Sequence, residues 1–376
     1  MQSIKLYGDI KLNIHEQRIE KLRSRFNEKQ IDGLLVFIGE NRFYLSGFKG
    51  EDSQFDETAG FLVIGKEKLV LATDSRFTFQ AKSEAPLYDV YCYKDFTTQI
   101  ADIMDIAGIK KAGFESARIS VDTFEKIKSG LKKELTLKPV TGIVEELRVI
   151  KDENEIDIMR KSLHKAEKSL KDILKDIQPG MTEKEGAWLL EKTLRDMGAE
   201  ALSFSTITAS GKNSAMPHAI PSDKIFEEKE PILFDWGIIL DSYCSDITRT
   251  FCLDSNDGKF KKIFSIVKKA QDEATKAICA GITGKEVDAI ARKIIIDAGY
   301  GDFFGHGLGH GVGLAVHESP RLSPLYDKKL EEGMVVTIEP GIYLPNWGGI
   351  RLENMAVVRK DGAELLNSTT PEEFLL

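Results

Sequence analysis

The 376-residue sequence predicts a two-domain protein of the α/β (α+β) class. Three observations support this prediction. Short apolar runs alternate with helical patterns in the first part of the chain, the composition changes near Thr141-Gly142, and a set of residues then recurs at a fixed distance. We therefore expect a smaller domain over residues 1–142 and a larger domain with an internal repeat over residues 143–376.

Composition limits the classes of protein to consider. Hydrophobic residues make up 42% of the chain and charged residues 30%, which is typical of a globular protein. The net charge of -8 disfavours a nucleic acid or an anionic membrane as a partner. The four cysteines show no CxxC spacing, and no apolar run approaches the ~18 residues of a membrane span. We expect a soluble cytoplasmic protein with reduced cysteines.

The N-terminal domain is expected to alternate helices with strands. Apolar positions at a near-helical spacing predict a helix over residues 14–30. Short apolar runs bounded by turn-forming residues predict strands at 33–38, 61–64, 69–71 and 111–114. We find no catalytic constellation in this domain.

The second domain begins with helices whose first turns carry capping signals. Asp152 and Glu155 predict a helix over residues 152–177, and Thr182 with Glu185 predicts the start of the next helix. Five residues then recur as the same residue types 101 positions later: Gly180, Thr182, Lys184, Glu185 and Gly198 match Gly281, Thr283, Lys285, Glu286 and Gly299. The repeat predicts two halves related by pseudo-twofold symmetry, with a ligand site between them.

Two acidic residues belong to a predicted hairpin in the first half. Pro231–Leu240 and Ser242–Leu253 read as strands joined by a turn centred on Leu240-Asp241, which would place Asp235 directly opposite Asp246. Two facing carboxylates repel each other unless a cation lies between them. A bound metal is the simplest explanation.

The second half repeats this plan. Met334–Tyr343 and Gly349–Val358 read as strands on either side of a turn, with Glu339 and Glu353 embedded among apolar residues. Ionised carboxylates are costly to bury without a partner. The alternative is that all four acids are ordinary strand-end residues, solvated or paired with arginines such as Arg249 and Arg351.

A glycine-rich stretch, Gly305–Glu318, contains His306, His310 and His317. Glycine at almost every other position disfavours a helix, so this backbone is shaped for close approach to another group. Clustered histidines favour a metal ligand or a proton carrier. The alternative is a surface loop without a function.

Four carboxylates and one imidazole would balance the charge of two divalent cations. The oxygen-rich ligand set favours manganese, iron, cobalt or zinc over copper, and ligand type alone does not choose among these four metals. We expect manganese, with cobalt, zinc or iron as alternatives. Two such ions can activate a water and stabilise charge on the attacking and leaving atoms. Hydrolysis is therefore the leading chemistry.

At these residues the sequence resembles the pita-bread metallopeptidases, in particular the Xaa-Pro peptidases (aminopeptidase P and prolidase). The resemblance extends over nearly all of residues 150–360, and the stretches that carry it read MPHAIPSDK, DWGIILDSYCSDITRTF, HGLGHGVGLAVHE, IEPGIY and RLEN. The stretches ENRFYLSGF and TDSRF resemble the creatinase-type N-terminal domain. The resemblance implies a creatinase-like N-terminal domain followed by a pita-bread catalytic domain.

The resemblance also implies a role for each site residue. The metal ligands would be Asp235, Asp246, His310, Glu339 and Glu353. Of these, Asp246 and Glu353 would bridge two ions, and Glu339 would also take the proton of the attacking water. Substrate binding and stabilisation of the tetrahedral intermediate would fall to His218 and His317. The proline pocket would be lined by His306, and the metal site would be supported by Tyr343 and Arg351.

The leading function is an Xaa-Pro aminopeptidase acting on small peptides with proline in second position. The alternatives are an Xaa-Pro dipeptidase and a non-enzymatic binding protein of the same fold. Methionine aminopeptidases usually lack such an N-terminal domain, and creatinase lacks the metal ligands. The resemblance further implies a homodimer.

Overall fold

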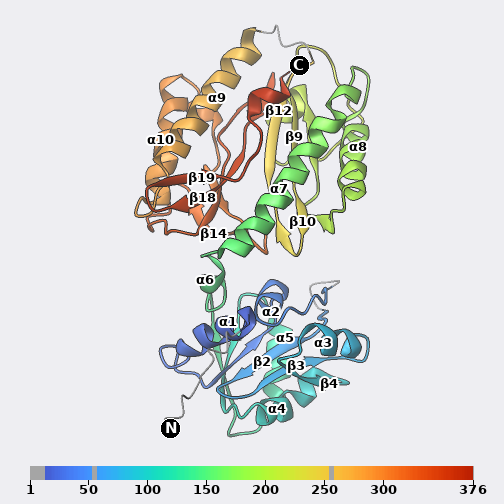
Figure 1. Cartoon of the computed structure of the whole chain (residues 1–376), viewed down its shortest axis with the longest axis vertical. Helices are drawn as coiled ribbons and strands as arrows, with labels where there is room; N and C mark the ends of the chain where they lie inside the picture. The colour runs from blue at the N-terminus through green and yellow to red at the C-terminus, as the bar shows by residue number, and fades with distance from the viewer. Residues whose placement is uncertain (1–12, 53–56, 254–257, 376) are drawn as a thin grey trace, which may run out of the picture. The chain divides into compact units, whose positions relative to one another are not determined.

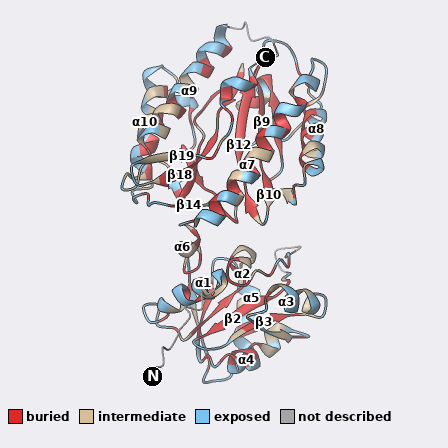
Figure 2. Ribbon diagram, viewed as in Figure 1, coloured by how far each residue is buried: buried red, intermediate tan, exposed pale blue. Residues whose placement is uncertain are grey.

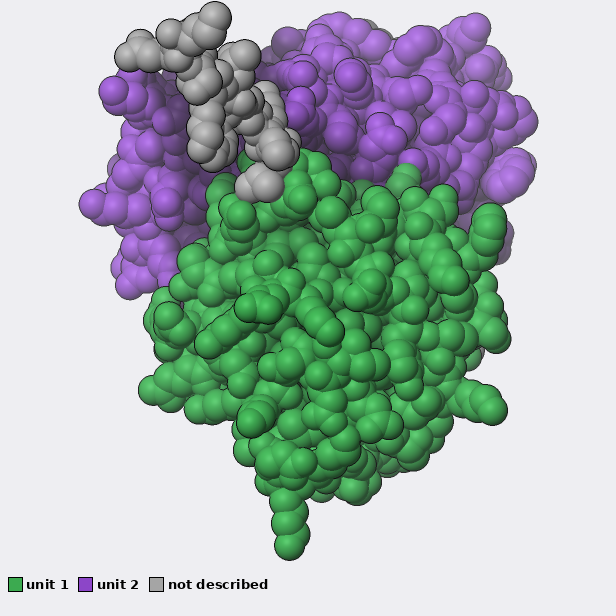
Figure 3. Space-filling model, turned by 60° about the horizontal axis from the view of Figure 1, so that its bottom comes forward, with its two compact units in different colours: residues 1–148 green, residues 149–376 purple. Residues whose placement is uncertain are grey.

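The computed structural model describes residues 13–52, 57–253 and 258–375. The chain divides into two compact units, Met1–Arg148 and Val149–Leu376, which are coloured separately in Figure 3. The boundary predicted after residue 142 falls shortly before the end of the first unit.

The first unit is a mixed six-stranded sheet in the order β4-β3-β2-β1-β5-β6, with helices packed against it (Figure 1). Its elements are α1 (Ile14–Ser24), β1 (Gly33–Val36), α2 (Gly39–Ser46), β2 (Phe61–Gly65), β3 (Leu69–Thr73), α3 (Thr78–Glu84), β4 (Asp89–Cys92), α4 (Phe96–Ile106), β5 (Lys111–Glu115), α5 (Val121–Ser129), β6 (Thr136–Val140) and α6 (Glu145–Arg148). The predicted strands are present. The helix predicted over residues 14–30 ends earlier, at Ser24, because turns follow it as far as Gln30, whose φ is 52°.

Four long helices of the second unit show the repeat. They are α7 (Glu153–Ile173), α8 (Glu183–Asp196), α9 (Gly258–Ala277) and α10 (Gly284–Asp297). Thr182 and Thr283 each cap a helix through a reciprocal bond pair with the glutamate three residues later. Such a cap contributes about 1 kcal/mol. Figure 1 shows α7 and α8 beside one set of strands and α9 and α10 beside the other, as the duplicated sequence predicts.

The strands of the second unit form small antiparallel sheets between these helices. The strands are β7 (Ala201–Leu202), β8 (Ile207–Ser210), β9 (Ile232–Trp236), β10 (Ile238–Leu240), β11 (Tyr243–Cys244), β12 (Ile247–Phe251), β13 (Gly309–Gly311), β14 (Glu318–Leu322), β15 (Val335–Ile338), β16 (Gly341–Leu344), β17 (Gly348–Arg351), β18 (Asn354–Arg359) and β19 (Gly362–Leu365). Short 3₁₀ turns lie at Leu174–Asp176, Gly211–Ala215 (η2), Gly301–Phe303 and Pro371–Phe374. Most strands are buried, whereas the helices expose one face (Figure 2). No helix among the described residues is both long and apolar enough to cross a lipid bilayer.

The register predicted for the first hairpin is wrong. The turn is formed by Asp241 and Ser242, whose φ values of 46° and 69° allow a two-residue loop, so the turn lies one residue later than predicted. Asp235 therefore pairs with Thr248. Asp246 precedes Thr248 by two residues, so it lies on the same face of the hairpin as Asp235 but diagonally from it. The two carboxylates still share one side of the sheet.

The second hairpin sets its two acids directly opposite each other. Leu344 pairs with Gly348 across the turn and Ile338 pairs with Asn354 farther along, which sets Glu339 opposite Glu353. The two hairpins meet where the backbone N–H of Glu353 donates to the carbonyl of Thr248, with an N···O distance of 3.1 Å. The acids of both halves are thereby brought to the same place.

The glycine-rich stretch is partly a strand rather than a loop. His310 lies in β13, which pairs with β14 and β15. A Cβ atom on the neighbouring Gly309 would lie only 2.1 Å from the carbonyl oxygen of Thr337. Glycine is therefore needed for the close approach of these two strands.

Candidate active site

All ten predicted site residues line one cavity of the second unit, with a volume of about 1000 Å³. They are His218, Asp235, Asp246, His306, His310, His317, Glu339, Tyr343, Arg351 and Glu353. They come from both hairpins, from the glycine-rich stretch and from the loop after η2, so both halves of the repeat contribute to the site.

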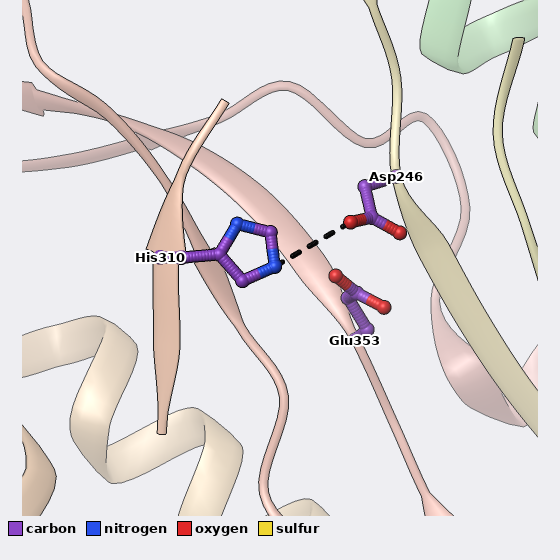
Figure 4. A group of neighbouring side chains, drawn as sticks. All are labelled: Asp246, His310 and Glu353. Atoms are coloured by element: carbon purple, nitrogen blue, oxygen red, sulfur yellow. Dashed lines mark ion pairs between the residues drawn. The ribbon is translucent and has the colours of Figure 1, made fainter. Parts of the chain in front are cut away.

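Three of these side chains form a compact group at the base of the cavity. Asp246, His310 and Glu353 each offer one ligand atom, and the three atoms lie within 4.8 Å of one another. Figure 4 shows His310 projecting from β13 toward the carboxylates of Asp246 and Glu353. The Nε2 atom of His310 lies 3.6 Å from Oδ2 of Asp246 and 3.3 Å from Oε1 of Glu339.

The tautomer of His310 follows from its other hydrogen bond. Its Nδ1 atom lies 3.1 Å from the carbonyl oxygen of Gly311, which can only accept, so Nδ1 carries the proton. Burial lowers the pKa of His310 to about 3, so the ring is neutral at pH 7. Its Nε2 lone pair therefore faces carboxylate oxygens. This arrangement is typical of a histidine that binds a metal through one nitrogen and is oriented through the other.

A hydrogen-bonded chain connects Asp235 to His306. Nη2 of Arg351 donates to Oδ2 of Asp235 at 2.6 Å, and its Nη1 donates to the Tyr343 hydroxyl at 2.9 Å. Burial lowers the pKa of His306 to about 4, and its Nδ1–H donates to the carbonyl of Gly307. Nε2 of His306 therefore accepts a bond from the Tyr343 hydroxyl, 2.9 Å away. The chain fixes the orientation of Asp235 at one end and of His306 at the other.

Two buried threonines support the carboxylates. Thr248 donates to Oε2 of Glu353 at 2.7 Å and accepts from Nε of Arg351 at 3.0 Å. Thr337 donates to Oε1 of Glu339 at 3.1 Å and accepts from the backbone N–H of His310 at 3.0 Å. Our sequence interpretation missed both. The available signal was strand alternation, because each threonine lies two residues from a candidate acid and therefore on the same face.

The carboxylates are buried and close enough to raise one another's pKa. Burial raises the pKa of Asp235, and Arg351 opposes the change. Burial and the neighbouring Glu353 raise the pKa of Asp246 well above its ordinary value, and burial and Glu339 do the same for Glu353. Burial also raises the pKa of Glu339 to about 7. A cation among these groups would restore their ionised forms.

The residues present fit divalent cations. Among the described residues, the buried oxygens Oδ1 of Asp235 and Oε1 of Glu353 have no hydrogen-bond partner, which is costly unless a further ligand is bound. Pairing with arginine accounts for Asp235 alone. Arg249 instead donates to the backbone carbonyl and not to the carboxylate of Glu353. The alternative of acids neutralised only by arginines therefore does not describe this cluster.

The remaining histidines lie on the cavity wall. His218 and His317 are exposed, and the ring of His317 packs edge-on against His310 with a centroid distance of 4.4 Å. Partial burial lowers the pKa of His317. Arg321, which our sequence interpretation did not single out, also lines the cavity and pairs with His310 across β13 and β14.

Comparison with known proteins places this geometry in a family. The model of Metallopeptidase family M24 matches residues 157–360, more than half of the chain, and the model of the Creatinase/Prolidase N-terminal domain matches residues 18–150. The Xaa-Pro dipeptidase of Pyrococcus horikoshii is 36% identical over 363 residues, covering 96% of this chain and 99% of its relative.

Two solved structures match nearly the whole chain. The Xaa-Pro dipeptidase from Bacillus anthracis has a TM-score of 0.90 at 37% identity, and the match covers 96% of this chain and 100% of that chain. The X-Pro aminopeptidase from Thermotoga maritima has a TM-score of 0.87 at 38% identity and covers 95% and 99%. The predicted α/β fold, with a creatinase-type domain before a pita-bread domain, is confirmed. The chain therefore belongs to Metallopeptidase family M24, as the sequence resemblance predicted.

Proposed function

We propose that this metallopeptidase uses two divalent cations to hydrolyse the peptide bond between an N-terminal residue and proline. One observation carries the proposal: four carboxylates and a neutral, buried histidine converge on a cavity large enough for a peptide. The names of its relatives, Xaa-Pro dipeptidase and X-Pro aminopeptidase, support the choice of bond.

The chain's own residues would hold the cations through oxygen and nitrogen atoms. The proposed ligands are Asp235, Asp246, His310, Glu339 and Glu353. Bound divalent cations supply an acidified water and an electrophile for the scissile carbonyl. Manganese is our first choice because of the excess of carboxylate ligands, with cobalt, zinc and iron as alternatives.

Proton transfer and charge stabilisation are assigned to neighbouring side chains. Glu339 accepts the proton of the attacking water, and its carboxylate is oriented by Thr337. His218 and His317 donate hydrogen bonds to the oxygen that gains negative charge. The lowered pKa of His317 supports this role, because a neutral ring has one N–H to donate and does not repel the cations.

The proline ring is assigned to the apolar wall of the cavity. Ile220, Phe303 and Pro217 line the cavity, as does His306, whose ring is held by the Tyr343 hydroxyl. A rigid ring binds such a wall with little loss of conformational freedom.

The two possible substrate lengths are each supported by one feature. Arg321 lines the cavity, and its side chain has no hydrogen-bond or ion-pair partner among the described residues, so its guanidinium suits the terminal carboxylate of a dipeptide. The volume of about 1000 Å³ exceeds what a dipeptide needs, which favours longer peptides. The sequence alone put the aminopeptidase first, but Arg321 and the relatives support the dipeptidase at least as well.

The test is hydrolysis of an Xaa-Pro dipeptide, its C-terminal amide and an Xaa-Pro-Xaa tripeptide, after chelation and after adding back manganese, cobalt or zinc. A dipeptidase cleaves the free dipeptide alone, and Arg321→Met should then raise its KM about 10- to 100-fold. An aminopeptidase cleaves the tripeptide before proline, and Arg321→Met changes little. No cleavage with any metal contradicts the proposal.

Two further expectations stay predictions. The homodimer implied by the resemblance is tested by sedimentation of the purified protein, where a monomer would contradict it. The cytoplasmic location is tested by fractionation of cells that produce the full chain.

A further inference from the structure

The loop that carries His218 has little regular structure of its own. It begins with η2 (Gly211–Ala215) and has no helix or strand between residues 216 and 231. Its outer residues are exposed, with Ile220 at 85%. A loop of this kind is mobile unless it is anchored, and a mobile histidine cannot hold a catalytic geometry.

A buried carboxylate joins the two sides of this loop at its base, beside backbone bonds such as the one from the N–H of Lys184 to the carbonyl of Ser222. Glu183, the first residue of α8, is completely buried. Its Oε1 accepts from the backbone N–H of Ser210 at 2.7 Å and from Nδ2 of Asn213 at 3.1 Å. Its Oε2 accepts from the hydroxyl of Ser222 at 2.6 Å and from the same residue's backbone N–H at 3.0 Å. Because Asn213 precedes His218 and Ser222 follows it, Glu183 closes the loop on both sides.

Two further contacts extend the anchor toward the site. Nη1 of Arg351 donates to the carbonyl of Pro217 at 3.3 Å, directly before His218. Ser214 accepts from the backbone N–H of Gly349 at 2.8 Å. The first half of the repeat thus holds the loop at its base, and the second half holds it both at Ser214 and directly before His218.

The surroundings of Glu183 suit an acceptor. Each of these partners is an N–H or O–H donor, and the position at the first turn of α8 places the carboxylate at the positive end of the helix dipole. Replacing the carboxylate by an amide would set N–H groups against N–H and O–H donors. The loop would then lose bonds on both sides of His218.

We propose that Glu183 is a positioning residue for His218, acting on the reaction only through the loop that it closes. The inference rests on the proposed function, in which His218 binds the substrate. It assigns to Glu183 a part in catalysis although its side chain is buried beneath the loop.

The test is a double-mutant cycle with Glu183→Gln and His218→Ala, measuring kcat and KM for an Xaa-Pro substrate. In the wild-type background, Glu183→Gln should lower kcat/KM about 10-fold. The change should appear in whichever of kcat and KM is changed by His218→Ala. In the His218→Ala background, Glu183→Gln should lower kcat/KM less than about twofold. Ser222→Ala, which removes only one hydroxyl, should give a weaker effect in the same direction and covers the case in which Glu183→Gln folds poorly.

A matched control is available in Glu167. It is also completely buried and accepts bonds from an asparagine, a serine and a threonine at residues 367–369. Residues 367–369 are not among the described residues that line the cavity. Glu167→Gln should change activity by the same factor in the presence and absence of His218.

A second readout does not depend on activity. NMR of the histidine rings, with the His218 signal assigned from the His218→Ala protein, should show that signal shifted or broadened by Glu183→Gln and unchanged by Glu167→Gln. An unchanged His218 signal together with additive kinetics overturns the inference. A His218 signal that is shifted in Glu183→Gln supports the positioning by Glu183. If the His218→Ala protein nevertheless hydrolyses the substrate at the wild-type rate, the proposed role of His218 is contradicted.

Discussion

The clearest consequence of the acidic cluster concerns Glu339→Gln in the metal-free protein. Burial raises the pKa of Glu339 from 4.5 to about 7, which means that the folded chain holds this proton more tightly than the unfolded chain. Stability therefore falls as pH rises from 4.5 through 7, because the unfolded state ionises first. The glutamine variant has no proton to lose at this position and escapes this loss.

The size of the effect follows from the two pKa values. They differ by about 2.5, and each pKa unit corresponds to about 1.4 kcal/mol, so the full difference is about 3 kcal/mol. Above pH 7.5 the metal-free variant should be more stable than the wild type by about this amount, and near pH 4.5 the two should be equal. For a unit of this size, the melting temperature rises by about 6–12 °C.

The assay is chemical or thermal unfolding after chelation, at several pH values between 4.5 and 8. The exposed Glu332 offers a matched control, because Glu332→Gln removes an acid without relieving buried repulsion. Saturation with manganese should remove most of the difference at high pH, since binding at 100 times Kd stabilises the wild type by about 3 kcal/mol and the variant has lost a proposed ligand. A constant difference between wild type and Glu339→Gln across this pH range would refute the reasoning.

Two further predictions test the supports of the site. Tyr343→Phe removes the buried hydroxyl shared by Arg351 and His306, and a lost bond of this kind lowers the free energy of unfolding by about 1–3 kcal/mol. Because the same bonds orient Asp235 and His306, kcat/KM should fall about 10-fold or more, and unchanged kinetics would count against the hydrogen-bonded chain. Gly309→Ala places a Cβ atom 2.1 Å from the carbonyl oxygen of Thr337 and should lower the free energy of unfolding by about 1–3 kcal/mol in denaturant titrations. Gly305 has open space around it, so Gly305→Ala should leave the free energy of unfolding unchanged. Equal effects of the two alanines would contradict this account.

Local sequence signals determined the helix starts and the repeat. The threonines at 182 and 283 each bond the backbone three residues later, and that bond depends only on neighbouring residues. The candidate acids were also recognisable, because a carboxylate embedded in an apolar strand needs a partner wherever that strand lies. The order of these residues along the chain sufficed to identify the family.

Tertiary structure decided the hairpin register and the hydrogen bonds between residues that are far apart in the sequence. The register of the first hairpin turned on left-handed φ values at Asp241 and Ser242, which the residue types allowed but did not require. The pairing of Arg351 with Asp235 joins residues more than 100 positions apart, as does the bond between Thr248 and Glu353. Such contacts form only when the two halves pack, because no local energy selects them. The sequence therefore singled out the candidate ligands, and the fold decided which residues hold them in place.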